Sequence, residues 1–296
     1  MESVTINGVQ LEYEATGSGE PVLLISPVLA DGFLPLLSEP SLANRHLLIR
    51  YHKRGWAGST HTPPPVTIGD HARDAAALLE HLGITRAHVA GHSSGAAVAA
   101  QLALDRPEIV HALILMELSL LSVPSGERFL EQAGPAFEAY ASGDHDRALA
   151  MFMTVVSGLD WPTCRALLED RTPGAVAQAV EDADTFFGIE LPALTEWEFG
   201  PRQAAAIDQS VLSILGSQTQ PLWVEVADFL RSAIAQVEEI TIDGVGHLLH
   251  AQRPEPVARG MAEFLQRNAI ARDQVPERSA SEKNRRLPAA VASSDR

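Results

Sequence analysis

The stretch that decides the fold is Val89-Ala90-Gly91-His92-Ser93-Ser94-Gly95-Ala96-Ala97. It contains the pattern G-x-S-x-G, between a short apolar segment typical of a buried strand and a run of small residues typical of a helix. A serine on such a sharp turn has a strained backbone, and side chains in place of Gly91 and Gly95 would collide. The alternative is an ordinary turn with a surface serine. The strand and helix patterns on either side favour Ser93 as an exposed nucleophile.

The segments around this turn alternate between strand and helix patterns. Alternating apolar and polar residues around Asn7-Gly8 predict an antiparallel hairpin at the start of the chain. Short apolar runs then predict strands buried on both faces, and apolar residues three and four apart predict helices. This order predicts an α/β fold with a mostly parallel, doubly wound sheet. The predicted strands are residues 21–26, 46–51, 88–90, 112–116, 211–215 and 237–242, and the helices are residues 68–82, 94–104, 221–235 and 254–266.

The pattern changes between residues 121 and 205. Segments 126–141, 146–156 and 172–187 look helical, and prolines interrupt them. We interpret 121–205 as a helical cap inserted into a core made of residues 1–120 and 206–270. From 271 to 296 the chain is polar and without periodicity, so it cannot bury enough apolar surface to offset its ordering entropy. A flexible polar tail is expected there.

Composition limits the partners and the compartment. The formal net charge of −16 would repel nucleic acid and an anionic membrane over most of the surface. Cys164 is the single cysteine, which excludes an internal disulfide and a cysteine-based metal site. The first residues lack a basic start followed by an apolar run, and no segment is long enough to span a bilayer. We expect a cytoplasmic protein with no nucleic-acid or membrane partner.

A serine nucleophile needs a base, and His247 is the candidate. It ends the run Asp243-Gly244-Val245-Gly246-His247, after the strand predicted at 237–242 and before the helix that Pro254 opens. That loop lies at the same edge of the sheet as the turn carrying Ser93. The chain has 11 histidines, and this position favours His247 over His250, His111 and His52.

The acid that orients the histidine is harder to identify. Its usual place is the turn after the strand at 211–215, but residues 216–220 read GSQTQ and contain no carboxylate. Glu117 ends the buried apolar strand before the cap, where a carboxylate loses solvation unless something pairs with it. Glu117 is therefore the predicted acid, although it would also suit a role in capping the insertion. Glu225 and Asp228, on the next predicted helix, are the substitutes.

Two backbone N–H groups are expected to bind an oxyanion. One is that of Ser94, at the start of the predicted helix. The other should come from residues 26–32, SPVLADG. Pro27 has no N–H, so Val28 is the first residue able to donate, with Leu29 as the alternative.

With these residues in place, the chain resembles the α/β-hydrolase superfamily over residues 1–270. The resemblance lies in the turn at 91–95, in the segment RGWAGS at 54–59, which is similar to the family's R-G-x-G-x-S turn, and in Gly246-His247 ahead of Pro254. The interval from Ser93 to Glu117 is similar to that in zearalenone lactonases. Ser26-Pro27 stands where the family usually has His-Gly. The resemblance implies an α/β-hydrolase fold and an ester, lactone or thioester substrate.

The predicted function is therefore hydrolysis of a carboxylic ester or lactone through an acyl-enzyme on Ser93, with no metal or cofactor. The substrate is expected to be a small apolar molecule, and the protein a monomer or homodimer. Six apolar side chains are candidates to contact the substrate, because the cap commonly roofs the pocket. They are Leu29, Trp56, Trp161, Phe186, Phe187 and Trp197.

Three alternatives use the same sequence features. A C–C bond hydrolase, or a cofactor-free oxygenase or perhydrolase, would keep the serine, histidine and acid. A ligand receptor would keep the fold without turnover. A metal hydrolase would use His247 and His250, which are spaced like ligands on one helical face but lack an evident third ligand.

Overall fold

A computed structural model describes residues 1–271 and contains an eight-stranded sheet in the order β1-β2-β4-β3-β5-β6-β7-β8. The first two strand pairs, β1 with β2 and β2 with β4, are antiparallel, and all the others are parallel. The predicted fold class is confirmed. The strands are β1 (Glu2–Ile6), β2 (Val9–Gly17), β3 (Glu20–Ile25), β4 (His46–Tyr51), β5 (Ala87–His92), β6 (Val110–Met116), β7 (Ser210–Gly216) and β8 (Val237–Ile242).

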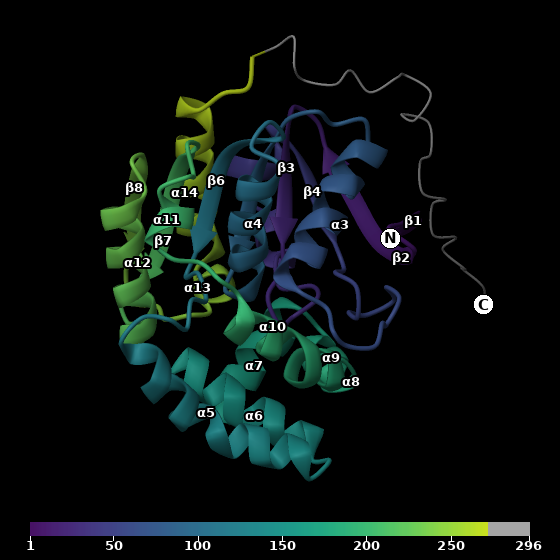
Figure 1. The fold of residues 1–296 in the computed structure, drawn as a ribbon, viewed down its shortest axis with the longest axis vertical. Helices are drawn as coiled ribbons and strands as arrows, with labels where there is room; N and C mark the ends of the chain where they lie inside the picture. Colours follow the sequence, from purple (N-terminus) through teal and green to yellow (C-terminus); the bar gives the residue numbers. More distant parts are fainter. Residues whose placement is uncertain (272–296) are drawn as a thin grey trace, which may run out of the picture.

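The hairpin at the start forms as predicted. Asn7 and Gly8 both have positive φ, 50° and 79°, which matches the twist that a two-residue hairpin turn needs. The central strands β3, β5 and β6 are almost wholly buried. Helices on both faces therefore bury these apolar runs, as a doubly wound sheet requires (Figure 1).

Two hydrophobic clusters lie on opposite faces of the sheet. One cluster contains α3 (Ile68–His81), α4 (Ser94–Asp105) and α12 (Pro221–Ala233), and it continues into the helices between β6 and β7. The other contains α1 (Leu34–Leu37), α2 (Pro40–Ala43), α13 (Leu249–Gln252) and α14 (Pro254–Arg267). The two-residue repeat of each strand divides its side chains between these clusters.

The segment between β6 and β7 is helical, as expected. In Figure 1 the helices α5 to α10 gather at one end of the sheet. The expected single helix at 172–187 is wrong. Gly174 has φ +84°, and a new helix, α8 (Ala175–Glu181), begins after it. The helix α7 (Trp161–Arg171) was not predicted. The helices are α5 (Ser125–Ala141), α6 (His145–Ser157), α7 (Trp161–Arg171), α8 (Ala175–Glu181), α9 (Ala183–Thr185), the π-helix η1 (Phe186–Glu190), α10 (Leu191–Glu196) and α11 (Pro201–Ala204).

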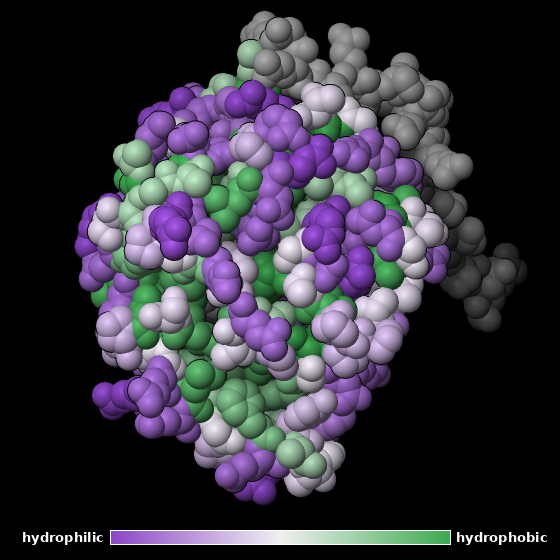
Figure 2. Space-filling model, in the orientation of Figure 1, coloured by the Kyte–Doolittle hydropathy of each residue, from purple (hydrophilic) through white to green (hydrophobic). Residues whose placement is uncertain are grey.

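The surface is largely polar. Hydrophilic residues cover much of the face in Figure 2, and hydrophobic ones show mainly in the lower part of that view. Within residues 1–271 no helix combines the length and apolar character needed to cross a bilayer. Beyond residue 271, the tail expected at 271–296 lies outside the described residues.

Candidate active site

Ser93 occupies the turn between β5 and α4 with φ 55° and ψ −121°, a backbone conformation that non-glycine residues rarely adopt. A Cβ on Gly95 would lie 2.1 Å from the carbonyl oxygen of Ile25, and one on Gly91 would lie 2.3 Å from that of Gly95. Both glycines are therefore needed for the helix to approach the sheet this closely. The Ser93 N–H donates to Met116 O at 3.0 Å, which ties the turn to β6.

His247 and Glu117 meet although 130 residues separate them in sequence. The His247 Nδ1–H donates to Glu117 Oε2 at 2.7 Å, and both side chains are almost fully buried. Glu117 also accepts from the Gly216 N–H at 2.8 Å and the Thr219 hydroxyl at 2.7 Å. The turn after β7, which has no carboxylate of its own, thus supplies the donors that hold Glu117 in place.

The two substitute acids point elsewhere. Glu225 accepts from the N–H and the hydroxyl of Ser125, at 2.7 and 2.5 Å, and so caps the start of α5. Those bonds hold the pKa of Glu225 below its ordinary value. Asp228 pairs with Arg231 on the surface of α12. Of the three carboxylates considered, Glu117 is the one that contacts His247.

Ser93 and His247 line the same cavity, and two residues that the sequence did not single out accompany them. The Ser93 hydroxyl shares a hydrogen bond with that of Ser119, with 3.0 Å between the oxygens. The ring of Trp223 stacks on the imidazole of His247, with centroids 3.9 Å apart and planes at 24°. Neither contact has a local sequence signal, because each depends on how separate elements pack.

The cavity holds about 560 Å³ of space outside protein atoms, part of it open to solvent. Val28 and Ser94, the expected oxyanion donors, line it together with Leu29 and Phe186. Most of the remaining lining is apolar and comes from the segment between β6 and β7. These residues are Leu121, Phe129, Phe152, Met153, Val156, Leu191 and Leu194.

Four of the expected substrate contacts lie away from this lining, and packing explains each position. Trp56 is buried and donates its indole N–H to Glu190 Oε2 at 3.0 Å. Trp197 donates to Gln101 at 2.8 Å, and Phe187 stacks on Tyr140. Trp161, partly exposed, begins α7. An indole N–H needs a hydrogen-bond acceptor, and this requirement draws Trp56 and Trp197 out of an apolar pocket.

Two further histidines pack beneath His247. The ring of His92 lies 4.6 Å from that of His247 and 4.4 Å from that of His250. Burial lowers the pKa of His92 well below its ordinary value, and it lowers that of His250 to about 3, so both are neutral. The His92 Nε2–H donates to the backbone oxygen of His247 at 2.9 Å and thereby fixes the loop.

These contacts also bear on the alternative in which His247 and His250 bind a metal ion. Both ring nitrogens of His250 are buried without a hydrogen-bond partner, while His247 Nδ1 faces Glu117. In the part of the chain described, 1–271, no three His, Cys, Asp or Glu side chains are grouped as metal ligands.

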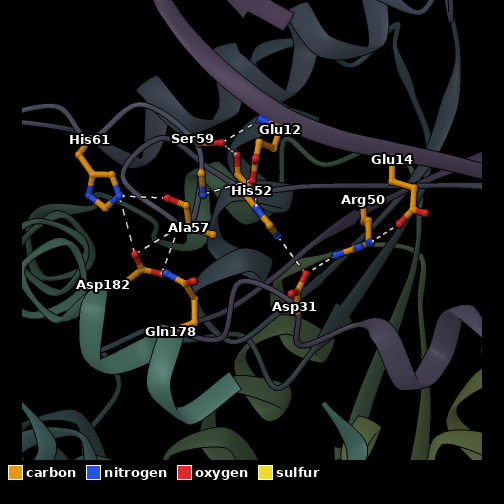
Figure 3. A network of polar contacts seen from close by, with 11 residues as sticks. Glu12, Glu14, Asp31, Arg50, His52, Ala57, Ser59, His61, Gln178 and Asp182 are labelled. Carbon is orange, nitrogen blue, oxygen red and sulfur yellow. Dashed lines mark hydrogen bonds and ion pairs between the residues drawn. The ribbon is translucent and has the colours of Figure 1, made fainter. Parts of the chain in front are cut away.

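A polar network fixes the loop that carries Val28 (Figure 3). Asp31, on this loop, lies 3.0 Å from His52 Nε2 and also pairs with Arg50. The hydrogen bond with His52 is the largest cause that holds the pKa of Asp31 below its ordinary value, and the pairing with Arg50 adds to it. Arg50 and His52 are in turn held by Glu14 and Glu12 of β2, at 2.8 and 2.9 Å. The loop that carries Val28 is therefore anchored to the antiparallel part of the sheet.

The turn after β4, residues 53–59, contacts the helices between β6 and β7. The Lys53 ammonium donates to Glu190 Oε2 of η1 at 2.6 Å, and both side chains are almost fully buried. Burial lowers the pKa of Lys53, and the Glu190 carboxylate opposes that effect. The Thr185 hydroxyl donates to Gly55 O at 2.6 Å. These bonds fix η1, which places Phe186 in the cavity.

The same turn makes a second contact with these helices. The Ala57 N–H donates to the carboxylate of Asp182, at 3.1 and 3.2 Å from its two oxygens (Figure 3). Asp182 also accepts from Gln178 of α8 at 3.2 Å. The turn after β4 therefore holds the helices on both sides of Ala183–Thr185.

Known proteins similar to this chain share its architecture. The family described as the alpha/beta hydrolase fold matches residues 30–254. A Klebsiella pneumoniae protein named putative carbamate hydrolase RutD is 34% identical over 77% of this chain and 85% of its own length. A protein of that name from Azorhizobium caulinodans is 36% identical, and the match spans 36% of this chain and 40% of that relative.

Solved structures agree in fold. A thermophilic esterase from Thermogutta terrifontis superimposes with a TM-score of 0.75 at 21% identity, over 91% of this chain and 99% of the esterase. An enol-lactonase from Burkholderia xenovorans LB400 gives 0.69 at 20% identity, over 90% and 100%. The family match covers most of the chain, and the sheet order and the turn at Ser93 agree with it. The chain belongs to the α/β-hydrolase fold family.

Proposed function

We propose that this protein is a serine hydrolase that cleaves carboxylic esters or lactones through an acyl-enzyme on Ser93. Membership of the α/β-hydrolase family supports an enzyme of the hydrolase class. The observation that carries the proposal is the 2.7 Å contact between His247 Nδ1 and Glu117, beside a cavity that Ser93 also lines. In this proposal Ser93 is the nucleophile, His247 the base and Glu117 the acid.

In the first step, His247 acts as the base. Its Nδ1–H is donated to Glu117, so Nε2 is the nitrogen with a free lone pair. The Ser93 hydroxyl turns from Ser119 toward Nε2, gives up its proton and attacks the carbonyl carbon. The N–H groups of Val28 and Ser94 bind the oxyanion, and Glu117 stabilises the imidazolium.

In the second step, the tetrahedral intermediate collapses and the acyl-enzyme is hydrolysed. The carbon–oxygen bond to the leaving group breaks, and that oxygen takes the proton from His247 Nε2. Water, deprotonated by His247, then attacks the acyl carbonyl. The carbon–oxygen bond to Ser93 breaks, Ser93 Oγ takes the proton back from His247, and the acid is released. The mechanism uses only side chains and backbone groups at the cavity.

The lining indicates the kind of substrate. Leu29, Phe129, Phe152 and Met153 offer carbon atoms rather than hydrogen-bonding groups to an acyl chain or ring. This favours an ester or lactone with an apolar acyl group over a carbamate, the substrate in the names of the relatives. An ester or lactone with an apolar acyl portion is therefore the proposed substrate.

Hydrolysis of a substrate panel tests the proposal. The panel contains p-nitrophenyl esters of increasing acyl length, small and macrocyclic lactones, and a carbamate. We expect turnover of apolar esters or lactones, and a loss of at least about a thousandfold in Ser93→Ala with an unchanged circular dichroism spectrum. Unchanged turnover in Ser93→Ala would refute the nucleophile.

Product analysis by mass spectrometry separates the rival activities. A C–C bond hydrolase leaves simple esters intact and splits a carbon chain, and an oxygenase or perhydrolase adds oxygen from O₂ or peroxide. A ligand receptor binds panel members without turnover of any. Each of these outcomes replaces the ester or lactone assignment.

A further inference from the structure

We propose that Ser119 is a further catalytic residue, whose hydroxyl donates a hydrogen bond to the leaving-group oxygen as the acyl-enzyme forms. This inference rests on the proposed function. Ser119 lies two residues beyond Glu117, after β6, and its N–H donates to Ser93 O at 3.2 Å. Its hydroxyl lies 3.0 Å from the Ser93 hydroxyl, and both side chains are only partly buried.

The other polar side chains of the cavity are already engaged or withdrawn. In the described part of the chain, six lining side chains carry polar atoms: His92, Ser93, Ser94, Ser119, Trp223 and His247. His92 is buried and holds the backbone of His247, and the Ser94 hydroxyl and the Trp223 indole nitrogen are buried without a partner. Once Ser93 turns toward His247, the Ser119 hydroxyl loses its partner inside an apolar pocket. A substrate oxygen is the acceptor that would replace it.

Sheet order decides which substrate oxygen this is. Strand β5, which leads to Ser93, lies between β3 and β6. Val28 follows β3 and Ser119 follows β6, so the oxyanion loop and Ser119 flank Ser93 on opposite sides. When the oxyanion binds the N–H groups of Val28 and Ser94, the Ser119 side is left to another substituent of the tetrahedral carbon. The leaving oxygen, attached to the same carbon as Ser93 Oγ, comes within reach of a hydroxyl now 3.0 Å from Ser93.

Ser119 does not transfer its own proton when the acyl-enzyme forms. His247 has taken the Ser93 proton, and the breaking carbon–oxygen bond leaves its electron pair on the leaving oxygen. That oxygen receives the proton from His247 Nε2. Ser119 keeps its own proton and stabilises the negative charge that develops on the leaving oxygen before the transfer is complete.

This role makes the effect of Ser119 depend on the leaving group. An alkoxide concentrates negative charge on its oxygen, whereas p-nitrophenolate spreads it over the ring and needs little help. Ethyl butyrate and p-nitrophenyl butyrate form the same acyl-enzyme, so kcat/KM compares acylation alone. We expect Ser119→Ala to lower kcat/KM by about 10- to 100-fold for the ethyl ester and by less than about threefold for the p-nitrophenyl ester.

Two variants control the comparison. Ser119→Thr keeps the hydroxyl and should restore most of the ethyl ester activity. Ser122→Ala removes an exposed serine from the same loop and should leave both esters unchanged. A uniform loss in Ser119→Ala with both esters, or no loss with either, overturns the leaving-group role. Ester turnover that survives Ser93→Ala overturns the proposed function itself, so the two failures are distinguishable.

Discussion

Glu117 is a buried carboxylate whose loss of solvation is offset by hydrogen bonds. The residue has φ 43° and ends β6 within the protein, where an ionised carboxylate would be costly if unpaired. Its oxygens accept hydrogen bonds from Gly216, Thr219 and His247, which replace the lost water. The strained backbone directs the carboxylate at the histidine.

Glu117→Gln tests this at the residue scale. The amide cannot stabilise the imidazolium, and it can present its NH₂ group to His247 and favour the wrong tautomer. We expect kcat for a p-nitrophenyl ester to fall on the order of 10³- to 10⁴-fold. Glu225→Gln is the matched control, because it weakens the cap of α5 and leaves His247 untouched. Loss of activity in the control alone would move the acid to α12.

Single residues differed in how far the sequence could predict them. Gly91 and Gly95 carry a local signal, because the close approach of α4 to β5 and β3 allows no other residue. Ser119 and Trp223 carry none, since a serine in a loop and a tryptophan on an amphipathic helix are ordinary. Their contacts with Ser93 and His247 arise from packing between elements.

At the scale of elements, the turn after β4 couples the sheet to the helices between β6 and β7. Lys53 reaches η1 through a buried ion pair, and Trp56 donates to the same carboxylate. Phe186, at the start of η1, lines the cavity and packs against Trp56. The position of one pocket wall thus depends on polar bonds made outside the pocket.

A double-mutant cycle measures this coupling. Lys53→Met leaves Glu190 buried without its cation, which should lower the free energy of unfolding by about 3–5 kcal/mol. Adding Glu190→Gln removes the stranded charge and keeps an acceptor for Trp56, so the double variant should regain at least about 1 kcal/mol. Urea denaturation followed by tryptophan fluorescence gives both values.

The control for this cycle is the exposed ion pair of Arg259 with Glu255 on α14. Arg259→Met should lower the free energy of unfolding by less than about 1 kcal/mol. A Lys53→Met variant as stable as Arg259→Met would contradict the assigned role of the buried pair.

The elements of the sheet could be predicted because each has a strong pattern. Strands such as β3 and β7 are apolar runs, and α3 begins with a capping box at Thr67 and Asp70. The segment around η1 could not be predicted, since a π-helix between α9 and α10 has no sequence period of its own. Tertiary bonds from the turn after β4 determine its shape.

On the scale of the whole molecule, neutral histidines are buried across both faces of the sheet. Burial lowers the pKa of His71 and His92 well below the ordinary value, that of His88 to about 4 and that of His250 to about 3. The unfolded chain binds these protons near pH 6.5, while the folded chain does not. Stability from this source is complete above pH 6.5 and is lost as pH falls toward the folded pKa values.

The free energy of unfolding should therefore decrease from pH 7 to pH 5. Each such histidine adds a slope of up to about 1.4 kcal/mol per pH unit. The His250 ring lies beside Phe33, and neither of its nitrogens has a hydrogen-bond partner. The variant His250→Phe should therefore lower the slope of the free energy of unfolding against pH by the contribution of about one proton. Equal slopes in wild type and His250→Phe would show that His250 titrates alike in both states.

The most direct measurement of the central claim is covalent labelling of the folded protein by a fluorophosphonate, with the modified residue located by peptide mass spectrometry. Because His247 has to activate Ser93 before it can attack phosphorus, we expect one adduct on Ser93, absent in Ser93→Ala and at least about a hundredfold slower to form in His247→Ala. An adduct on another residue, or labelling of Ser93 at the same rate without His247, would contradict the account.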